Sequence, residues 1–225
     1  MPMTIVQCDG PVTLLGGGAL GEGDLALALG RAPCLVAADG GARHALAAGH
    51  APRAVIGDMD SLGEAARLYA GRLHEIAEQD STDFDKALRN IDAPLVLAVG
   101  FTGGRLDHEL AAFHVLAARP DRRCLLIGAE SLVFLCPPEI VLDLAPGTPF
   151  SLFPMGALRC ASQGLRWATD GLVFSPAARI GTSNEVTGPV TLRPEAPLML
   201  AIAPRAALDA VITGLMAAKR AWPPR

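Results

Sequence analysis

Aromatic residues are scarce in this chain of 225 residues: they make up 4% of it, although 51% of the residues are hydrophobic. A sizeable core can therefore form, but alanine, leucine and valine must fill most of it. Long apolar runs are also missing, since none approaches the roughly 18 residues of a membrane-spanning helix. The first ten residues show no basic stretch followed by an apolar one, as a secretory signal would. We therefore expect a cytoplasmic protein without a membrane partner.

Clusters of basic residues are absent as well. The formal net charge is −4, and no block rich in lysine or arginine stands out. A basic patch is the usual electrostatic footprint of a protein that binds nucleic acid or an anionic membrane. We therefore expect neither of these partners.

Cysteine is infrequent, and no pair has the C-x-x-C spacing of a redox or zinc motif. The count is odd, and two of the cysteines lie in apolar, strand-like runs. This pattern predicts buried, reduced thiols and disfavours disulfides and zinc ligation. The five residues are Cys8, Cys34, Cys124, Cys136 and Cys160.

The first half of the chain alternates short apolar runs with helical patterns. Such alternation predicts parallel strand pairing in a doubly wound α/β sheet, and continuous apolar strands fit a sheet that is covered on both faces. The predicted strands are Val12–Leu15, Cys34–Ala38, Ala54–Ile56, Leu95–Val99 and Cys124–Ile127. The predicted helices are Asp24–Leu29, Ala42–Ala48, Leu62–Tyr69, Phe84–Asn90 and His108–Ala118.

The second half has a different rhythm. After Cys136-Pro137-Pro138, short β-type runs are broken by glycine and proline, which predicts an antiparallel sandwich or a small barrel. We therefore divide the chain into domains at 1–137 and 138–225, and we expect a helix from Ala206 to Ala221. The β-type runs include Ile140–Leu144, Pro149–Phe153, Gly164–Trp167, Leu172–Phe174 and Leu198–Ile202.

Acidic residues follow the predicted strands of the first half. Asp39 follows one strand, and Asp58 and Asp60 follow the next in a Gly-Asp-Met-Asp-Ser sequence. Ligands of an open α/β sheet bind beyond the carboxyl ends of its strands. Carboxylates that converge there repel one another unless a cation lies between them, and Mg²⁺ prefers oxygen ligands. Each aspartate alone could be a helix cap or a turn residue, but the combination favours a metal site.

Two further segments carry residues suited to phosphate. Thr82 and Asp83 precede Lys86 by four and three residues, so the three share one face at the start of a predicted helix. Helix capping and a surface ion pair are the alternative interpretation. Arg105 follows two glycines after another strand, and it could contact phosphate or be a solvated surface residue. The glycines at 16–18 fit a dinucleotide-binding pattern poorly, but they could lie near a nucleotide.

Several motifs, in the same order, resemble those of the thiamine pyrophosphokinase family. They are A-D-G-G-A (38–42), G-D-M-D-S (57–61), Q-D-S-T-D-F-D-K-A (79–87), G-x-x-G-G-R-x-D-H (100–108), G-L-R-W (164–167) and T-S-N-E (182–185). The resemblance implies an α/β domain followed by an antiparallel β-sandwich, and a homodimer whose active sites are shared between chains. It also implies Mg²⁺ as cofactor and ATP as co-substrate.

The resemblance also implies roles for individual residues. Metal binding would fall to Asp39, Asp58, Asp60 and Asp83, and nucleotide or phosphate contacts to Thr82, Lys86, Arg105 and Asp107. The catalytic group would comprise Asp83, Lys86 and Arg105, and thiamine would lie near Gln79, Trp167, Ser183 and Asn184. Trp167 would stack on a thiamine ring; its alternative role is in the core of the sandwich.

The implied reaction is the transfer of the pyrophosphoryl group of ATP to the hydroxyl of thiamine, which gives thiamine diphosphate and AMP. Two alternatives remain open at this point. One is a Mg·ATP-dependent transferase acting on another small alcohol, and the other is a non-catalytic nucleotide sensor. The acid cluster with Lys86 argues against a sensor, and Trp167 with Ser183 and Asn184 argues for thiamine.

Overall fold

The computed structural model describes residues 4–224, apart from the side chain at position 66. The chain forms two compact units. One comprises the described residues up to Val115 together with Leu126–Ala129, and the other comprises Leu116–Leu125 together with the chain from Glu130 onward. The division predicted at residue 137, with nucleotide on one side and thiamine on the other, stays a prediction.

The first unit is built on a sheet of parallel strands in the order β7-β2-β3-β4-β5. Every residue of β2, β4 and β7 is buried, which is the pattern of strands covered on both faces. The strands are β2 (Val12–Leu15), β3 (Cys34–Ala38), β4 (Ala54–Gly57), β5 (Leu73–Glu75) and β7 (Val96–Val99).

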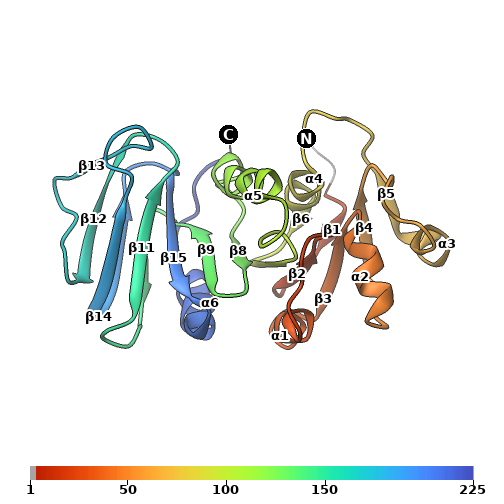
Figure 1. Cartoon of the computed structure of the whole chain (residues 1–225), viewed down its shortest axis with the longest axis horizontal. Coiled ribbons are helices and arrows are strands. Elements are labelled where there is room, and N and C mark those ends of the chain that lie inside the picture. The colour runs from red at the N-terminus through yellow and green to blue at the C-terminus, as the bar shows by residue number, and fades with distance from the viewer. Residues whose placement is uncertain (1–3, 225) are drawn as a thin grey trace. The chain divides into compact units, whose positions relative to one another are not determined.

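Helices connect these strands and cover the sheet. Figure 1 shows α1 and α2 on one side of the strands and α4 on the other. This arrangement follows from right-handed crossovers, because the strand order reverses between β2 and β7. The helices are α1 (Asp24–Leu29), α2 (Gly41–Ala47), α3 (Ala65–Leu68), the 3₁₀ turn Ala70–Arg72, α4 (Asp83–Arg89) and α5 (Leu106–Ala118).

A two-stranded parallel pair holds the beginning of the described chain. β1 (Val6–Gln7) pairs with β6 (Ile91–Asp92), and Val6 lies opposite Ile91. β8 (Cys124–Ile127) falls where the chain passes between the two units.

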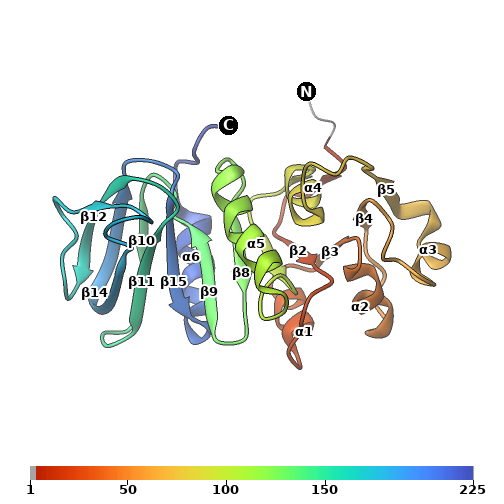
Figure 2. The ribbon, with the colours of Figure 1, turned by 45° about the horizontal axis from the view of Figure 1, so that its top comes forward.

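The second unit is antiparallel, and its long strand β14 takes part in two sheets (Figure 2). The first residues of β14 pair with β11, and its later residues pair with β12 and β10. The elements are β9 (Ser131–Leu135), β10 (Ile140–Leu142), β11 (Pro149–Pro154), β12 (Leu158–Leu165), β13 (Val173–Phe174), β14 (Thr182–Pro194), β15 (Met199–Pro204), the 3₁₀ turn Arg205–Ala207 and α6 (Leu208–Ala217).

The predicted fold class, a mostly parallel α/β part followed by an antiparallel β part, is confirmed. Some elements differ from the prediction. Of the run Gly164–Trp167, only the first two residues belong to a strand, because Gly164 has a φ of +75° at a bulge in β12. The C-terminal helix ends at Ala217 instead of Ala221, and the helix predicted over Leu62–Tyr69 shortens to Ala65–Leu68.

The cysteine prediction is wrong in part. All five thiols are free, and Cys124, Cys136 and Cys160 are buried, but Cys8 and Cys34 are only half-buried. Cys34 is exposed in part because it is the first residue of β3 and precedes the pairing with β4, which begins at Val36. Within residues 4–224, no helix has the length and apolar character needed to cross a bilayer.

Candidate active site

A pocket of about 620 Å³ opens at the carboxyl ends of the parallel strands, and all its lining residues lie between positions 17 and 112. Loops that follow β2, β3, β4 and β7 form it, together with the starts of α4 and α5. The strand order reverses between β2 and β7, and such a switch point is where open α/β sheets bind ligands. The volume is typical of a site for a small molecule.

Three carboxylates converge at this pocket: Asp39 and Asp58 line it, and Asp60 lies beside them without lining it. One oxygen each from Asp39, Asp58 and Asp60 can be chosen so that all lie within 4.8 Å of one another. Asp39 is 2% exposed, and its Oδ1 is buried without a hydrogen-bond partner among the described residues. A buried carboxylate oxygen without a donor is costly unless a cation or water meets it. The acids predicted from the strand ends are therefore brought together, and their geometry suits a divalent cation.

Backbone strain accompanies these acids. Asp39 and Met59 are the non-glycine residues with positive φ in the part of the chain that the structure describes, at +31° and +69°. Such conformations cost about 1–3 kcal/mol each and persist only where the surroundings enforce them. Gly57 allows the close approach, because a Cβ there would lie 2.7 Å from the Asp39 Cβ and 3.0 Å from an Asp83 carboxylate oxygen.

The acids differ in their electrostatics. Burial raises the pKa of the Asp39 carboxyl, and the carboxylates of Asp83, Asp60 and Asp58 add to that rise. Burial also raises the pKa of Asp83, against the opposing effect of Lys86. The pKa of Asp58 is lowered, because hydrogen bonds from the Asp60 N–H, Lys86 and Gln79 outweigh its burial. The group of four carboxylates therefore carries more negative charge than Lys86, the one amine in contact with it, can balance.

Lys86 is the cation at the centre of this group. Its side chain is 1% exposed, and its Nζ lies 3.2 Å from Asp83 Oδ1 and 3.3 Å from Asp58 Oδ2. Burial works against the charged amine, but the two carboxylates raise its pKa on balance. The alternative of a surface ion pair is therefore excluded for Lys86. Asp83 pairs with Lys86 and lies outside the group of three converging acids.

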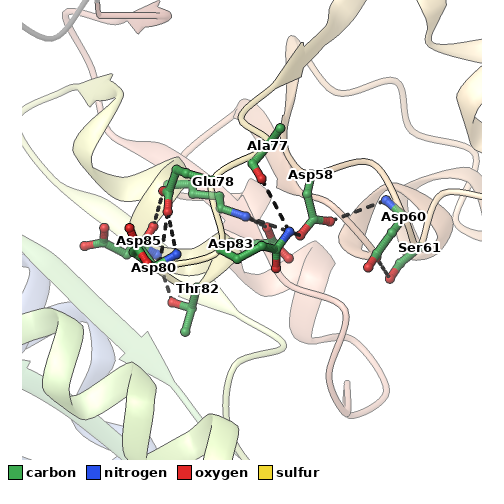
Figure 3. A network of polar contacts seen from close by, with 12 residues as sticks. Asp58, Asp60, Ser61, Ala77, Glu78, Asp80, Thr82, Asp83 and Asp85 are labelled. Carbon is green, nitrogen blue, oxygen red and sulfur yellow. Dashed lines mark hydrogen bonds and ion pairs between the residues drawn. The ribbon is translucent and has the colours of Figure 1, made fainter.

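The segment before α4 is held by a local network, drawn in Figure 3. Thr82 is the N-cap of α4, and its hydroxyl oxygen accepts the Asp85 N–H at 3.2 Å. Glu78 accepts the N–H groups of Asp80 and Ser81 at 2.9 and 3.1 Å, and Arg89 Nη2 lies 2.8 Å from Glu78 Oε1. The network fixes the path of the chain into the helix that carries Lys86.

Three further predicted residues, Gln79, Arg105 and Asp107, lie at or near the pocket and differ in their contacts. Gln79 is exposed and lines the pocket, and its Nε2 donates to Asp58 Oδ2 at 3.3 Å. Arg105 also lines the pocket, but it forms a two-point ion pair with Asp107 at 2.6 and 3.1 Å. Both of these side chains are exposed, at 71% and 64%. Asp107 is not among the lining residues.

The remaining predicted residues lie in the second unit. Trp167 is 55% exposed, with the Arg166 guanidinium 5.3 Å from its ring centroid. Asn184 is 4% exposed, and its amide accepts the Trp167 N–H at 3.1 Å and donates to the Trp167 carbonyl at 2.7 Å. Asn184 therefore fixes the backbone of Trp167, while its neighbour Ser183 is exposed. The alternative that Trp167 belongs to the core is excluded.

Comparison with known proteins gives a consistent result. Residues 25–126 match the family model described as "Thiamin pyrophosphokinase, catalytic domain". The chain is 30% identical to thiamine pyrophosphokinase 3 of Oryza sativa subsp. japonica over 156 residues, which is 60% of this chain and 58% of that protein. It is 30% identical to thiamine pyrophosphokinase 2 of the same plant over 176 residues, 68% of this chain and 66% of the relative. The chain belongs to the thiamine pyrophosphokinase family.

The fold comparison extends over more of the chain than the sequence matches do. The structure of the thiamin pyrophosphokinase from Candida albicans superposes on this chain with a TM-score of 0.71 at 14% sequence identity. The superposition covers 88% of this chain and 92% of the Candida chain. The matched regions of the two rice relatives are shorter, since they span 58% and 66% of those proteins. Residues 25–126, matched by the thiamine pyrophosphokinase model, include the pocket acids and Lys86 but not Trp167.

Three pocket residues escape the motif-based prediction in this member of the thiamine pyrophosphokinase family. Phe84 and Phe101 line the pocket with ring centroids 4.4 Å apart. Both lie inside motifs that were quoted for other residues, so the sequence could have indicated that they lie at the site. Arg43 also lines the pocket, and its guanidinium makes no hydrogen bond or ion pair with the part of the chain that the structure describes. No local pattern singles Arg43 out, because only the fold turns α2 toward the pocket.

Proposed function

We propose that this protein transfers the pyrophosphoryl group of ATP to the hydroxyl of thiamine and so forms thiamine diphosphate and AMP. One observation carries the proposal: at the pocket of the switch point, Asp39 and Asp58 converge with the neighbouring Asp60, beside the buried cation Lys86. Phosphoryl-type transfer depends mostly on positioning and charge neutralisation, and these are the groups that it needs. Membership of the thiamine pyrophosphokinase family supports the same reaction.

The donor set fits a hard divalent cation, and we infer that this is Mg²⁺. Carboxylate oxygens converge there, and among the described residues no donor reaches the Asp39 Oδ1. Asp39, Asp58 and Asp60 would hold the ion, and Asp83 would assist through its contact with Lys86. A bound Mg²⁺ supplies charge neutralisation to the phosphate oxygens of ATP.

Other side chains of the protein would bind and orient the reacting phosphates. In the reaction, the thiamine oxygen bonds to the β-phosphorus, the bond from that phosphorus to the α-phosphate bridging oxygen breaks, and the hydroxyl proton is released. Lys86, held between Asp58 and Asp83, places a fixed positive charge beside the phosphates. Arg43 and Arg105 border the same pocket and add cations at its rim. The Thr82 hydroxyl caps α4 with its oxygen and keeps its proton to donate. Asp107, paired with Arg105, would fix that arginine against the nucleotide.

We infer that thiamine binds against Trp167, with Gln79, Ser183 and Asn184 nearby. The exposed indole face suits a positively charged heteroaromatic ligand, and Asn184 holds the indole-bearing backbone in place. The pocket is lined by residues of the first unit alone, and Trp167 lies in the second. We propose that a second copy of the chain completes each site, in a cytoplasmic homodimer with no nucleic-acid or membrane partner.

The products test this function. Purified protein with ATP and Mg²⁺ should release AMP steadily only when thiamine is present, and phosphorus NMR should show thiamine diphosphate. ADP as the main nucleotide product would reject pyrophosphoryl transfer. AMP formation with another small alcohol but not with thiamine would favour the alternative transferase. Nucleotide binding without turnover in the presence of thiamine would favour a sensor.

A further inference from the structure

Cys8 and Cys34 form a thiol pair away from the pocket. The Cys8 sulfhydryl points at the Cys34 sulfur, with 3.0 Å between the two Sγ atoms. Both side chains are half-buried, whereas the other three cysteines of the chain are buried. Cys34 also lines a separate hollow of about 680 Å³ that opens to the surface, so small oxidants can reach it.

We propose that Cys8 and Cys34 are a redox-active pair that closes to an intramolecular disulfide when the protein meets a peroxide. A disulfide has a sulfur–sulfur bond of about 2.05 Å, so closure requires the two sulfurs to move together by about 1 Å. The balanced reaction is two thiols plus one hydrogen peroxide giving one disulfide and two water molecules. One thiolate attacks the peroxide to form a sulfenic acid and releases hydroxide. The second thiol then displaces that hydroxyl as water.

The surroundings assign the two steps to different sulfurs. Arg53 Nη1 lies 3.3 Å from Cys8 Sγ, and a guanidinium in contact with sulfur stabilises the charge of a thiolate. Burial and the Cys8 sulfur raise the pKa of the Cys34 thiol to about 11, against the opposing effect of Arg53. Cys8 is therefore the sulfur that attacks the peroxide, and Cys34 is the one that resolves the sulfenic acid.

The bond would join parts of the fold that are otherwise weakly connected. Cys8 follows β1, which is two residues long and pairs only with β6 among the described residues, and Cys34 begins β3 in the main sheet. The disulfide would therefore anchor the start of the described chain to the sheet. Cys34 lies at the opposite end of β3 from Asp39, so pocket geometry and turnover should change little.

Peptide mapping tests the pair directly. The full-length protein is treated with hydrogen peroxide, its free thiols are capped in denaturant, and it is cut with trypsin without reduction. Cleavage places Cys8 in residues 1–31 and Cys34 in residues 32–43, while Cys124 and Cys136 share residues 124–159. We expect the first two peptides to be joined, to separate after dithiothreitol, and the remaining cysteines to stay capped.

Thermal unfolding gives a second readout. Closing a loop of this size should raise the melting temperature of oxidised protein by about 5 °C, and the rise should be absent in Cys8→Ser and Cys34→Ser. Arg53→Gln should slow closure several-fold. Separate, capped Cys8 and Cys34 peptides after peroxide treatment would overturn the proposal, as would a bond between either sulfur and a different cysteine. The wild-type map decides the matter even where a variant fails to fold.

Discussion

Lys86 is a charged residue enclosed to a degree that is unusual for lysine, with 1% of its side chain exposed. The enclosure is tolerated because Asp58 and Asp83 meet its amine, although burying an ion pair in this way contributes little net stability by itself. The arrangement holds one positive charge rigidly where phosphate is expected. The ion pairs of Lys86 therefore matter more for where they hold the charge than for the stability of the fold.

Replacing Lys86 distinguishes its effect on turnover from its effect on stability. Lys86→Met keeps an unbranched side chain only one atom shorter and removes its charge, so Asp58 and Asp83 lose their shared partner. We expect turnover to fall by at least about 10²-fold and the free energy of unfolding to fall by about 1–3 kcal/mol. Urea unfolding and AMP release measure the two. Lys219→Met is the matched control, because Lys219 is the only other lysine of the sequence and is exposed.

The acids make a different prediction. Asp58→Asn or Asp60→Asn removes a formal charge from the converging group, and an amide binds a divalent cation poorly. Turnover should fall by at least about 10²-fold, and Mg²⁺ should lose its ability to raise the melting temperature. Asp143→Asn, at an exposed position of the second unit, should leave both unchanged. Near-native turnover in a folded Asp58→Asn or Asp60→Asn protein would show that these acids act as structural caps.

At the scale of elements, the approach to α4 depends on one glutamate. Glu78 accepts hydrogen bonds from the Ser81 hydroxyl, from Arg89 and from two backbone N–H groups, and these partners lower the pKa of its carboxyl to about 2. A folded-state pKa below the ordinary value of 4.5 means that the ionised carboxylate stabilises the fold. That contribution is present above pH 4.5 and is lost as the pH falls toward 2.

Glu78→Gln should therefore be less stable than the parent at pH 7, and the difference should shrink between pH 4.5 and pH 2. Urea midpoints measured from pH 3 to pH 7 test this expectation. Glu139→Gln is a matched control, because that carboxylate pairs with Arg193 at the exposed surface, where ion pairs contribute little. A difference that persists unchanged at pH 3 would contradict the assigned role.

The elements also show where local patterns mislead. β14 contains Gly188 and Pro189, which favour a turn, yet the strand runs without interruption from Thr182 to Pro194. Pairing with β11, β12 and β10 outweighs these local preferences. Conversely, the predicted strand at 164–167 ends early because Gly164 takes a positive φ.

At the scale of the whole molecule, the shared site is open to test by mixing. Asp58→Asn damages the first unit, and Trp167→Ala damages the second. If two chains share each site, a mixed dimer contains one site with both defects and one with neither, so subunit exchange should restore activity. Light scattering first confirms that each variant is dimeric, and labelled subunits confirm that they exchange. No recovery after verified exchange would show that each chain builds its own site.

The sequence by itself determined the parallel architecture and the position of the acids within it. Buried parallel strands require continuous apolar runs, and β2 and β3 match the predicted bounds. Because parallel strands share a carboxyl edge, Asp39, Asp58 and Asp60 could be expected to meet there, as they do. These inferences need only local patterns and one rule of sheet geometry.

Only the tertiary structure decided which charges are buried and which distant side chains touch. Lys86 is enclosed because the end of β4 brings Asp58, 28 residues away, against it, whereas helix spacing alone left a surface ion pair open as an alternative. Cys8 meets Cys34, and Asn184 holds Trp167, across 26 and 17 residues. Burial and contact depend on long-range packing, which no local periodicity encodes. Local sequence motifs therefore indicate which residues form the site, but the tertiary structure determines their burial and their electrostatic environment.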